Sequence, residues 1–299
     1  MQTRSTIVYV YLDGEPVPAG RLEMIEDGRH SYATFQYDRR YLRRSDRVAV
    51  DPVALPLPDA AAPLRTFRTA EHFELFNGIR DAAPDGWGRC LMHKAAGATS
   101  LTEYNYLVAS GGYRVGALAF GPDATGGPKR LTPWREGDTI GEPLDLDALA
   151  EAADRVQSVD RFDSKLWRFL EAGSSLGGAR PKAAVDHRGM PWIAKFSAKG
   201  DTYPVCHTEL AVMRLAKECG LDVPETDFAS ILGRDIYLIQ RFDRATVGTK
   251  LLRRPFASAL TILGRRSWQR TAIATATSPR SCDASAQSRG AIYASCSCA

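Results

Sequence analysis

A glycine-rich segment holds the residues best suited to bind an anion. It reads Gly173-Ser174-Ser175-Leu176-Gly177-Gly178-Ala179-Arg180-Pro181-Lys182. Its glycines allow backbone torsions with positive φ, so that successive N–H groups can point at one anion, and the hydroxyls and cations add donors nearby. The spacing matches neither a Walker A loop nor the Gly-x-Gly-x-x-Gly of a dinucleotide fold. The segment favours phosphate binding, and the alternative is an ordinary glycine-rich entry to a hairpin.

A lysine and a glutamate downstream fit the same chemistry. Lys195 lies in the middle of the apolar run 192–196, and Glu209 opens a predicted helix 14 residues later. In kinases, a strand lysine that pairs with a helix glutamate contacts the nucleotide phosphates. The plainer alternatives are a solvent-exposed strand lysine and an acid that favours the first turn of its helix.

The run Leu238-Ile239-Gln240-Arg241-Phe242 could supply the connector of such a site. A strand period of two places Leu238, Gln240 and Phe242 on one face, where apolar side chains could enclose an adenine ring. A glycine loop, a strand lysine, a helix glutamate and a connector strand, in this order, predict the N-lobe of a kinase-like fold.

An α+β chain must position these residues. Alternating and helical periods predict strands at 6–11, 31–37, 115–120, 183–186, 191–196, 227–232 and 235–242, and helices at 71–78, 86–96, 101–110, 144–157 and 208–219. Turn residues predict hairpins at 187–189 and 233–234, and Gly220 predicts the end of the last helix. The turn-rich segment 123–145 predicts a linker.

The chain resembles the HipA toxins of bacterial type II toxin–antitoxin modules, which are protein serine/threonine kinases. The matching stretches are YLDGEPVPAGRL, FNGIRDAAPDGWGRCLM, EYNYLVASGGYRVGAL, GSSLGGARPKAAV, WIAKFSA, HTELAVMRLAKECGLDVPE and YLIQRFDR. The resemblance implies a β-rich N-terminal subdomain with helices over residues 1–122, then the linker, then a kinase-like N-lobe over residues 146–264.

The resemblance also implies roles for single residues. Contacts to ATP would come from Gly177, Gly178, Lys182 and Lys195 at the phosphates and from Gln240 and Phe242 at the adenine, with Glu209 as the partner of Lys195. Ser175 matches the serine that this family autophosphorylates, which ejects the loop and switches the kinase off. A phosphoserine charge of about −2 would repel bound ATP phosphates, which gives this switch a physical basis.

The resemblance stops near Gly264, before the acids that phosphoryl transfer needs. The family's catalytic loop, Asp-x-His-x-x-x-Asn, and the Asp that holds Mg²⁺ have no counterpart, because Asp283 is the sole acid in residues 265–299. We therefore expect a largely absent C-lobe, no catalytic residue, a lost Mg²⁺ site and no other metal ligand. The change of composition indicates a truncation or frame shift after about residue 264 and a disordered tail over residues 265–299.

Composition limits the class of protein. The chain has 299 residues, 44% of them apolar and 25% charged, as folded globular proteins do. Its net charge of +4 resides in the tail, so the body gives no argument for nucleic-acid binding. The six cysteines show no Cys-x-x-Cys spacing, which argues against zinc and a disulfide framework. No apolar run reaches about 18 residues and no secretory signal is present, so we expect a cytoplasmic protein without membrane contact.

Partners follow from the resemblance. They would be a protein substrate and a HipB-like helix-turn-helix antitoxin, through which the chain would reach DNA only indirectly. The leading hypothesis is a HipA-type kinase toxin that lacks its catalytic half. The alternatives are a non-catalytic fragment that binds the antitoxin and a small-molecule kinase on the same fold.

Overall fold

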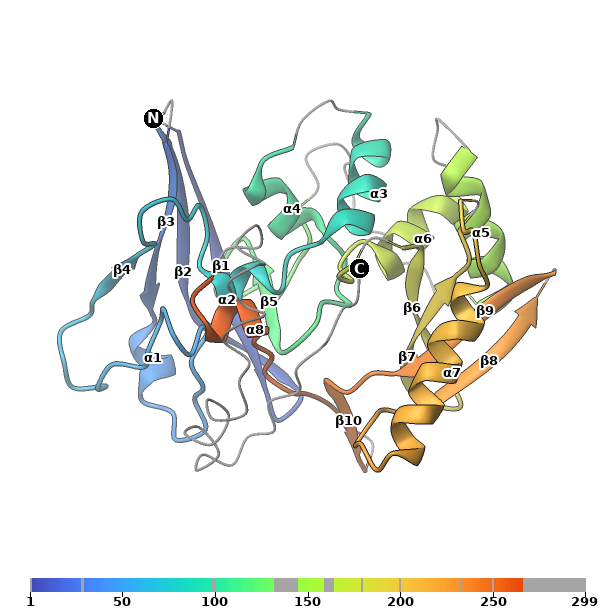
Figure 1. The fold of residues 1–299 in the computed structure, drawn as a ribbon. Coiled ribbons are helices and arrows are strands. Elements are labelled where there is room, and N and C mark those ends of the chain that lie inside the picture. The colour runs from blue at the N-terminus through green and yellow to red at the C-terminus, as the bar shows by residue number, and fades with distance from the viewer. Residues whose placement is uncertain are drawn as a thin grey trace.

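The structure is a computed structural model that describes residues 2–27, 30–97, 101–131, 145–158, 164–178, 180–198, 200–231, 233–248 and 250–265. Its architecture is α+β, with two large antiparallel sheets and helices around them (Figure 1). Most of the predicted linker and the predicted tail, apart from Arg265, lie outside the described residues.

The first sheet has five strands in the order β4-β3-β2-β1-β5. They are β1 (Gln2–Leu12), β2 (Glu15–Asp27), β3 (His30–Tyr37), β4 (Thr66–Arg68) and β5 (Leu118–Gly121). Side chains alternate across the sheet, so that Val8, Leu22 and Phe35 face one buried core. The strands predicted at 6–11 and 31–37 are confirmed.

Strand β2 was not predicted, because Pro16 and Pro18 argue against a central strand. The structure accommodates both prolines because residues 15–18 pair with β1 alone, and pairing with β3 begins at Gly20. The prolines therefore lie outside the part of β2 that pairs with β3, and that pairing loses no hydrogen bond to their missing N–H groups.

Four helices accompany this sheet: α1 (Arg39–Leu42), α2 (Asn77–Arg80), α3 (Gly86–Ala96) and α4 (Glu103–Ala109). The helices predicted at 86–96 and 101–110 are confirmed, and Thr102 caps the second of them by accepting from the Asn105 N–H. The helix predicted at 71–78 is wrong. Leu75 and Phe76 are both buried although they are adjacent, which suits an extended entry to the core, and α2 begins only after them.

The second sheet has four strands in the order β6-β7-β9-β8. They are β6 (Lys182–His187), β7 (Met190–Phe196), β8 (Thr226–Ile231) and β9 (Arg234–Gln240). Both predicted hairpins are confirmed, and Gly189 and Gly233 have the positive φ that their turns require.

Helices cover both faces of this sheet. They are α5 (Leu146–Ser158), α6 (Ser164–Gly173) and α7 (Val205–Glu218). Helix α7 packs on β8 and β9, whereas α5 and α6 pack against β6 from the other face. Helix α3, although it belongs to the predicted N-terminal subdomain, adds Trp87 and Leu91 to this second core, where Trp87 meets the Phe169 ring at 6.3 Å.

After β9 the chain returns to the first sheet. It forms β10 (Arg244–Val247), β11 (Lys250–Arg253) and α8 (Ala259–Ile262). Strand β11 lies against β1, and α8 lies against α2 (Figure 1). The half-buried Asp81 carboxylate accepts hydrogen bonds from the Ser258 N–H and the Thr261 hydroxyl, each at 2.7 Å. Contacts therefore cross the predicted domain bounds in both directions.

Candidate functional site

Two lysines share one face of the second sheet. Lys182 in β6 lies directly across from Lys195 in β7, and Tyr237 in β9 lies across from Lys195 on the other side. Residues opposite each other in an antiparallel ladder point to the same face. Two like charges in this arrangement repel each other, so the face is suited to hold an anion.

Glu209 from α7 balances one of the two charges. Lys195 Nζ donates to Glu209 Oε2 at 2.7 Å, and the same ammonium lies 5.4 Å from the centre of the Tyr237 ring. Both charged side chains keep about a third of their surface exposed. The structure thus brings the strand lysine and the helix glutamate together at the edge of solvent, where a ligand can reach them.

The glycine-rich loop passes beside these lysines. Gly178 has φ +101°, and a Cβ on it would lie only 2.3 Å from Lys182 Nζ. That ammonium donates to the carbonyl O of Gly177 at 2.5 Å. The backbone torsion therefore favours glycine at position 178, and a side chain there would also require the flexible Lys182 ammonium to move.

Ser175 is enclosed by the loop. It is 1% exposed, and its Oγ has no hydrogen-bond partner within the described part of the chain. The neighbouring Ser174 is also buried and accepts a hydrogen bond from the Gly111 N–H at 3.0 Å. A hydroxyl in this position cannot be modified unless the loop moves outward.

Burial makes Lys182 an unusual lysine. Loss of water first, and the nearby charge of Lys195 second, lower the pKa of Lys182 to about 8. Asp85 and Glu209 act in the opposite direction, so two carboxylates lie within electrostatic reach of this ammonium.

Helix α3 holds the loop in place from the N-terminal half of the chain. Gly178 donates its N–H to Asp85 Oδ2 at 3.1 Å and accepts at its carbonyl from the Trp87 N–H at 2.9 Å. The indole N–H of Trp87 also donates to the Lys182 carbonyl at 3.3 Å. No local pattern predicts these contacts, because Asp85 and Gly178 lie 93 positions apart.

Gln240 and Phe242 are not brought to the lysines. Gln240 lies across from Trp192, so its side chain shares the face that α5 and α6 cover, opposite to that of Lys195. The predicted strand face is wrong for Phe242, because β9 ends at Gln240. The Phe242 ring instead lies 5.7 Å from the ring of Phe256.

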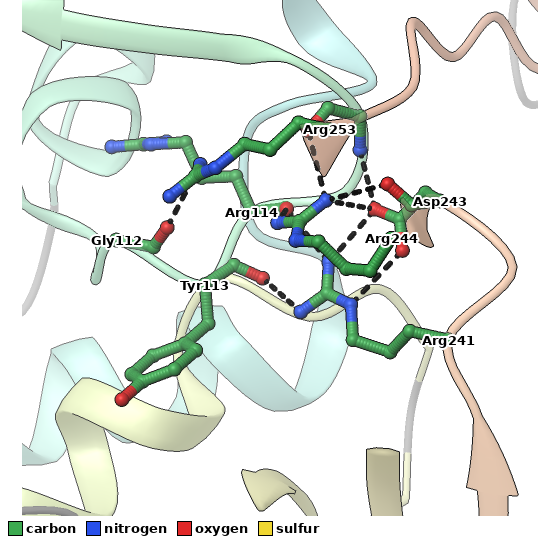
Figure 2. A network of polar contacts seen from close by, with 8 residues as sticks. Gly112, Tyr113, Arg114, Arg241, Asp243, Arg244 and Arg253 are labelled. Carbon is green, nitrogen blue, oxygen red and sulfur yellow. Dashed lines mark hydrogen bonds and ion pairs between the residues drawn. The ribbon is translucent and has the colours of Figure 1, made fainter. Parts of the chain in front are cut away.

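A buried charged network links the end of β9 to the first sheet. Asp243 accepts two hydrogen bonds from Arg241 and one from Arg244, and a further one from the Gly116 N–H at 2.7 Å (Figure 2). The two guanidinium groups also donate to main-chain carbonyls of residues 113–116. Burial raises the pKa of Asp243, but the hydrogen bond and charge of Arg241 outweigh it and hold that pKa below its usual range.

Within the described residues, no helix is both long and apolar enough to cross a membrane. In the same residues, no three His, Cys, Asp or Glu side chains come together in a way that could hold a metal ion.

Two family models match separate parts of the chain. Residues 8–121 match the model of the HipA N-terminal domain, and residues 174–292 match the model of the HipA-like C-terminal domain. The second match thus extends beyond Gly264, where the sequence resemblance was expected to stop. No curated protein matches the chain.

One similar solved structure is a complex described as the toxin–antitoxin system of Shewanella oneidensis MR-1, with HipA, HipB and its operator DNA. The match has a TM-score of 0.55 at 18% identity and covers 88% of this chain. It covers 57% of the chain in that complex, so the present chain spans little more than half of that relative. Matches to both HipA domains, in their expected order and on this fold, show that the chain belongs to the HipA family.

Proposed function

We propose that this chain is a HipA-type toxin component that binds ATP phosphates at the face shared by Lys182 and Lys195. The observation that carries the proposal is the placement of two lysines, one of them paired with Glu209, beside a glycine loop. The phosphates of a nucleoside triphosphate need cations close together, and this face supplies two of them.

The residues present fit the phosphates of ATP. The positive φ of Gly178 and the close approach of Lys182 form a cradle that a Cβ would fill, and the Tyr237 hydroxyl is buried without a partner among the described residues. Lys195 and Lys182 would neutralise phosphate charge, and Glu209 would hold Lys195 in position. Bound ATP would supply a transferable γ-phosphoryl group.

We derive no step through Mg²⁺, because the described residues gather no set of carboxylates that could ligate it. We therefore propose nucleotide binding without efficient phosphoryl transfer by this chain. Ser175 is the proposed phosphoacceptor by family resemblance, and its burial means that the loop must leave α3 before any transfer.

Binding of a non-hydrolysable ATP analogue, AMP-PNP, tests the site by calorimetric titration. Lys195→Met should weaken binding by about tenfold or more, because it removes a charge-assisted contact to phosphate. Lys217→Met is the matched control, since Lys217 lies in α7, the helix that carries Glu209, and forms a 2.8 Å ion pair with Glu225 on an exposed surface. Equal affinity of the wild type and both variants would refute the phosphate site.

Transfer is tested separately with radiolabelled ATP. We expect no label on the wild-type protein beyond that on Lys195→Met. Strong incorporation at Ser175 would show that the chain is catalytically complete, contrary to the proposal.

A second candidate function is binding of a HipB-like antitoxin without catalysis. The similarity to a chain of a complex that contains HipB and operator DNA favours it. Co-purification with the helix-turn-helix product of a neighbouring gene would support this function, and it would be independent of Lys195. Under either proposal the protein acts in the cytoplasm.

A further inference from the structure

The amide of Gly178 is already occupied by a carboxylate. In a phosphate-binding loop, backbone N–H groups at glycines with positive φ are the donors to the anion. Here Gly178, at φ +101°, donates its N–H to Asp85 Oδ2 at 3.1 Å. A Cβ on the adjacent Gly177 would also meet that oxygen at 3.5 Å. The Asp85 carboxylate therefore lies where an anion would contact the loop.

Asp85 does not perform the usual function of its own position. It is the N-cap residue of α3, where an aspartate normally accepts from the N–H groups of the first helical turn. Its side chain makes no such bond. This carboxylate could accept a hydrogen bond from the Trp87 N–H. That N–H donates instead to the Gly178 carbonyl at 2.9 Å. Both bonds from α3 thus go to one glycine of the loop.

The charges of the site agree with this placement. Glu209 is paired with Lys195 at 2.7 Å, and Asp85 lies within electrostatic reach of Lys182. Lys182 thus lies within reach of two protein carboxylates, of which Glu209 is already paired with Lys195. A phosphate that entered beside Lys182 would meet the repulsion of Asp85 at close range.

We propose that Asp85 takes the place of a nucleotide phosphate on the loop, so that the N-terminal half of the chain holds the nucleotide site closed. When phosphate displaces it, the Asp85 carboxylate becomes free to cap α3 through the Trp87 and Gly88 N–H groups. The two arrangements exchange one set of hydrogen bonds for another of similar strength. This inference rests on the proposed ATP site and adds its regulation.

Removal of the carboxylate should strengthen nucleotide binding. We expect Asp85→Ala and Asp85→Asn to bind AMP-PNP about three- to tenfold more tightly than the wild type, because a nearby negative charge is lost. Asp186→Asn is the matched control: Asp186 also accepts from a glycine N–H at 3.1 Å, but in the exposed turn between β6 and β7. Its affinity should equal that of the wild type.

A second measurement does not need nucleotide. Hydrogen exchange of the amides in residues 174–178 should be faster in Asp85→Ala than in the wild type, while exchange in β7 and β9 stays unchanged. Saturating AMP-PNP should not raise exchange at Gly178 of the wild type, because phosphate takes over the hydrogen bond that Asp85 gives up. Faster exchange at Gly178 would mean that this bond is broken without replacement. The expected result is that the Gly178 amide stays protected, because phosphate replaces Asp85, while exchange at Gly88 slows, because Asp85 then caps α3.

The outcomes separate the two proposals. If neither the wild type nor the Asp85 variants bind AMP-PNP, both the site and its regulation are refuted. If the wild type binds in a Lys195-dependent manner and both Asp85 variants bind equally or more weakly, only the role of Asp85 is refuted. The isosteric Asp85→Asn variant keeps this comparison valid should Asp85→Ala fail to fold.

Discussion

Lys182 is a buried cation, and its burial costs free energy of folding. Its pKa falls from 10.5 in the unfolded chain to about 8 in the fold, through burial first and the charge of Lys195 second. Between these pH values the unfolded chain binds a proton that the folded chain releases, so stability rises with pH. The cost is fully present below about pH 8 and is gone above about pH 10.5.

We therefore expect pH to change the difference in stability between the wild type and Lys182→Met. The wild type should gain up to about 3 kcal/mol relative to the variant as pH rises from 8 to 10.5, because methionine has no proton to lose. Urea unfolding of both proteins at a series of pH values measures this difference. A constant difference would mean that Lys182 titrates as an ordinary lysine.

The same proton should govern nucleotide affinity. An anion bound beside Lys182 raises its pKa above the value of about 8 in the free protein, so binding takes up a proton. AMP-PNP affinity of the wild type should therefore decrease as pH rises through about 8, and Lys182→Met should bind weakly without that step. Identical pH profiles for the two proteins would place the nucleotide elsewhere.

At the scale of elements, α3 can dock on the loop because Gly88 has no side chain. A Cβ there would lie 2.0 Å from the Ser174 carbonyl oxygen. That oxygen belongs to the backbone and cannot rotate away as a side chain could. Alanine favours a helix by about 1 kcal/mol over glycine, yet Gly88→Ala should separate α3 from the loop. We expect faster hydrogen exchange over residues 174–178 in this variant.

Gly112→Ala is the control for that substitution, since a Cβ at Gly112 would meet nothing within 4 Å. Its exchange pattern should match the wild type. If residues 174–178 of Gly88→Ala exchanged at the same rate as in the wild type, α3 and the loop would not be in tight contact.

The elements that could be predicted are those with local signals. Gly189 and Gly233 marked both hairpins of the second sheet, and a single strand-to-helix step brought Lys195 near Glu209. Strand β2 was missed because two prolines hid its alternation, and α6 was missed although Leu166, Phe169 and Leu170 recur at helical spacing. Asp85 could not be placed, because its contact with Gly178 spans 93 residues and only the fold creates it.

At the scale of the whole molecule, Asp243 is the counter-charge that allows Arg241 and Arg244 to be buried between the two sheets. All three side chains are less than 5% exposed. Asp243→Asn removes this counter-charge from two buried guanidinium groups. The substitution should lower the free energy of unfolding by about 3–5 kcal/mol. Urea unfolding at pH 7 measures the loss.

The exposed pair between Asp13 and Lys250 provides the comparison. Asp13→Asn should change stability little, because water already screens this pair. A similarly small loss in Asp243→Asn would contradict a structural role for the buried network. Because the pKa of Asp243 is depressed, its contribution should persist above about pH 4, the unfolded value, and disappear as pH falls further.

The contact between Asp81 and Thr261, which lie 180 positions apart, has a consequence for protein synthesis. At about 5–20 residues per second, a ribosome needs roughly 10–40 s to make the chain between them. During that interval the N-terminal sheet exists without α8, and the carboxylate that α8 will cover remains hydrated. A chaperone that binds nascent chains would therefore find this surface open until residues 259–262 have been made.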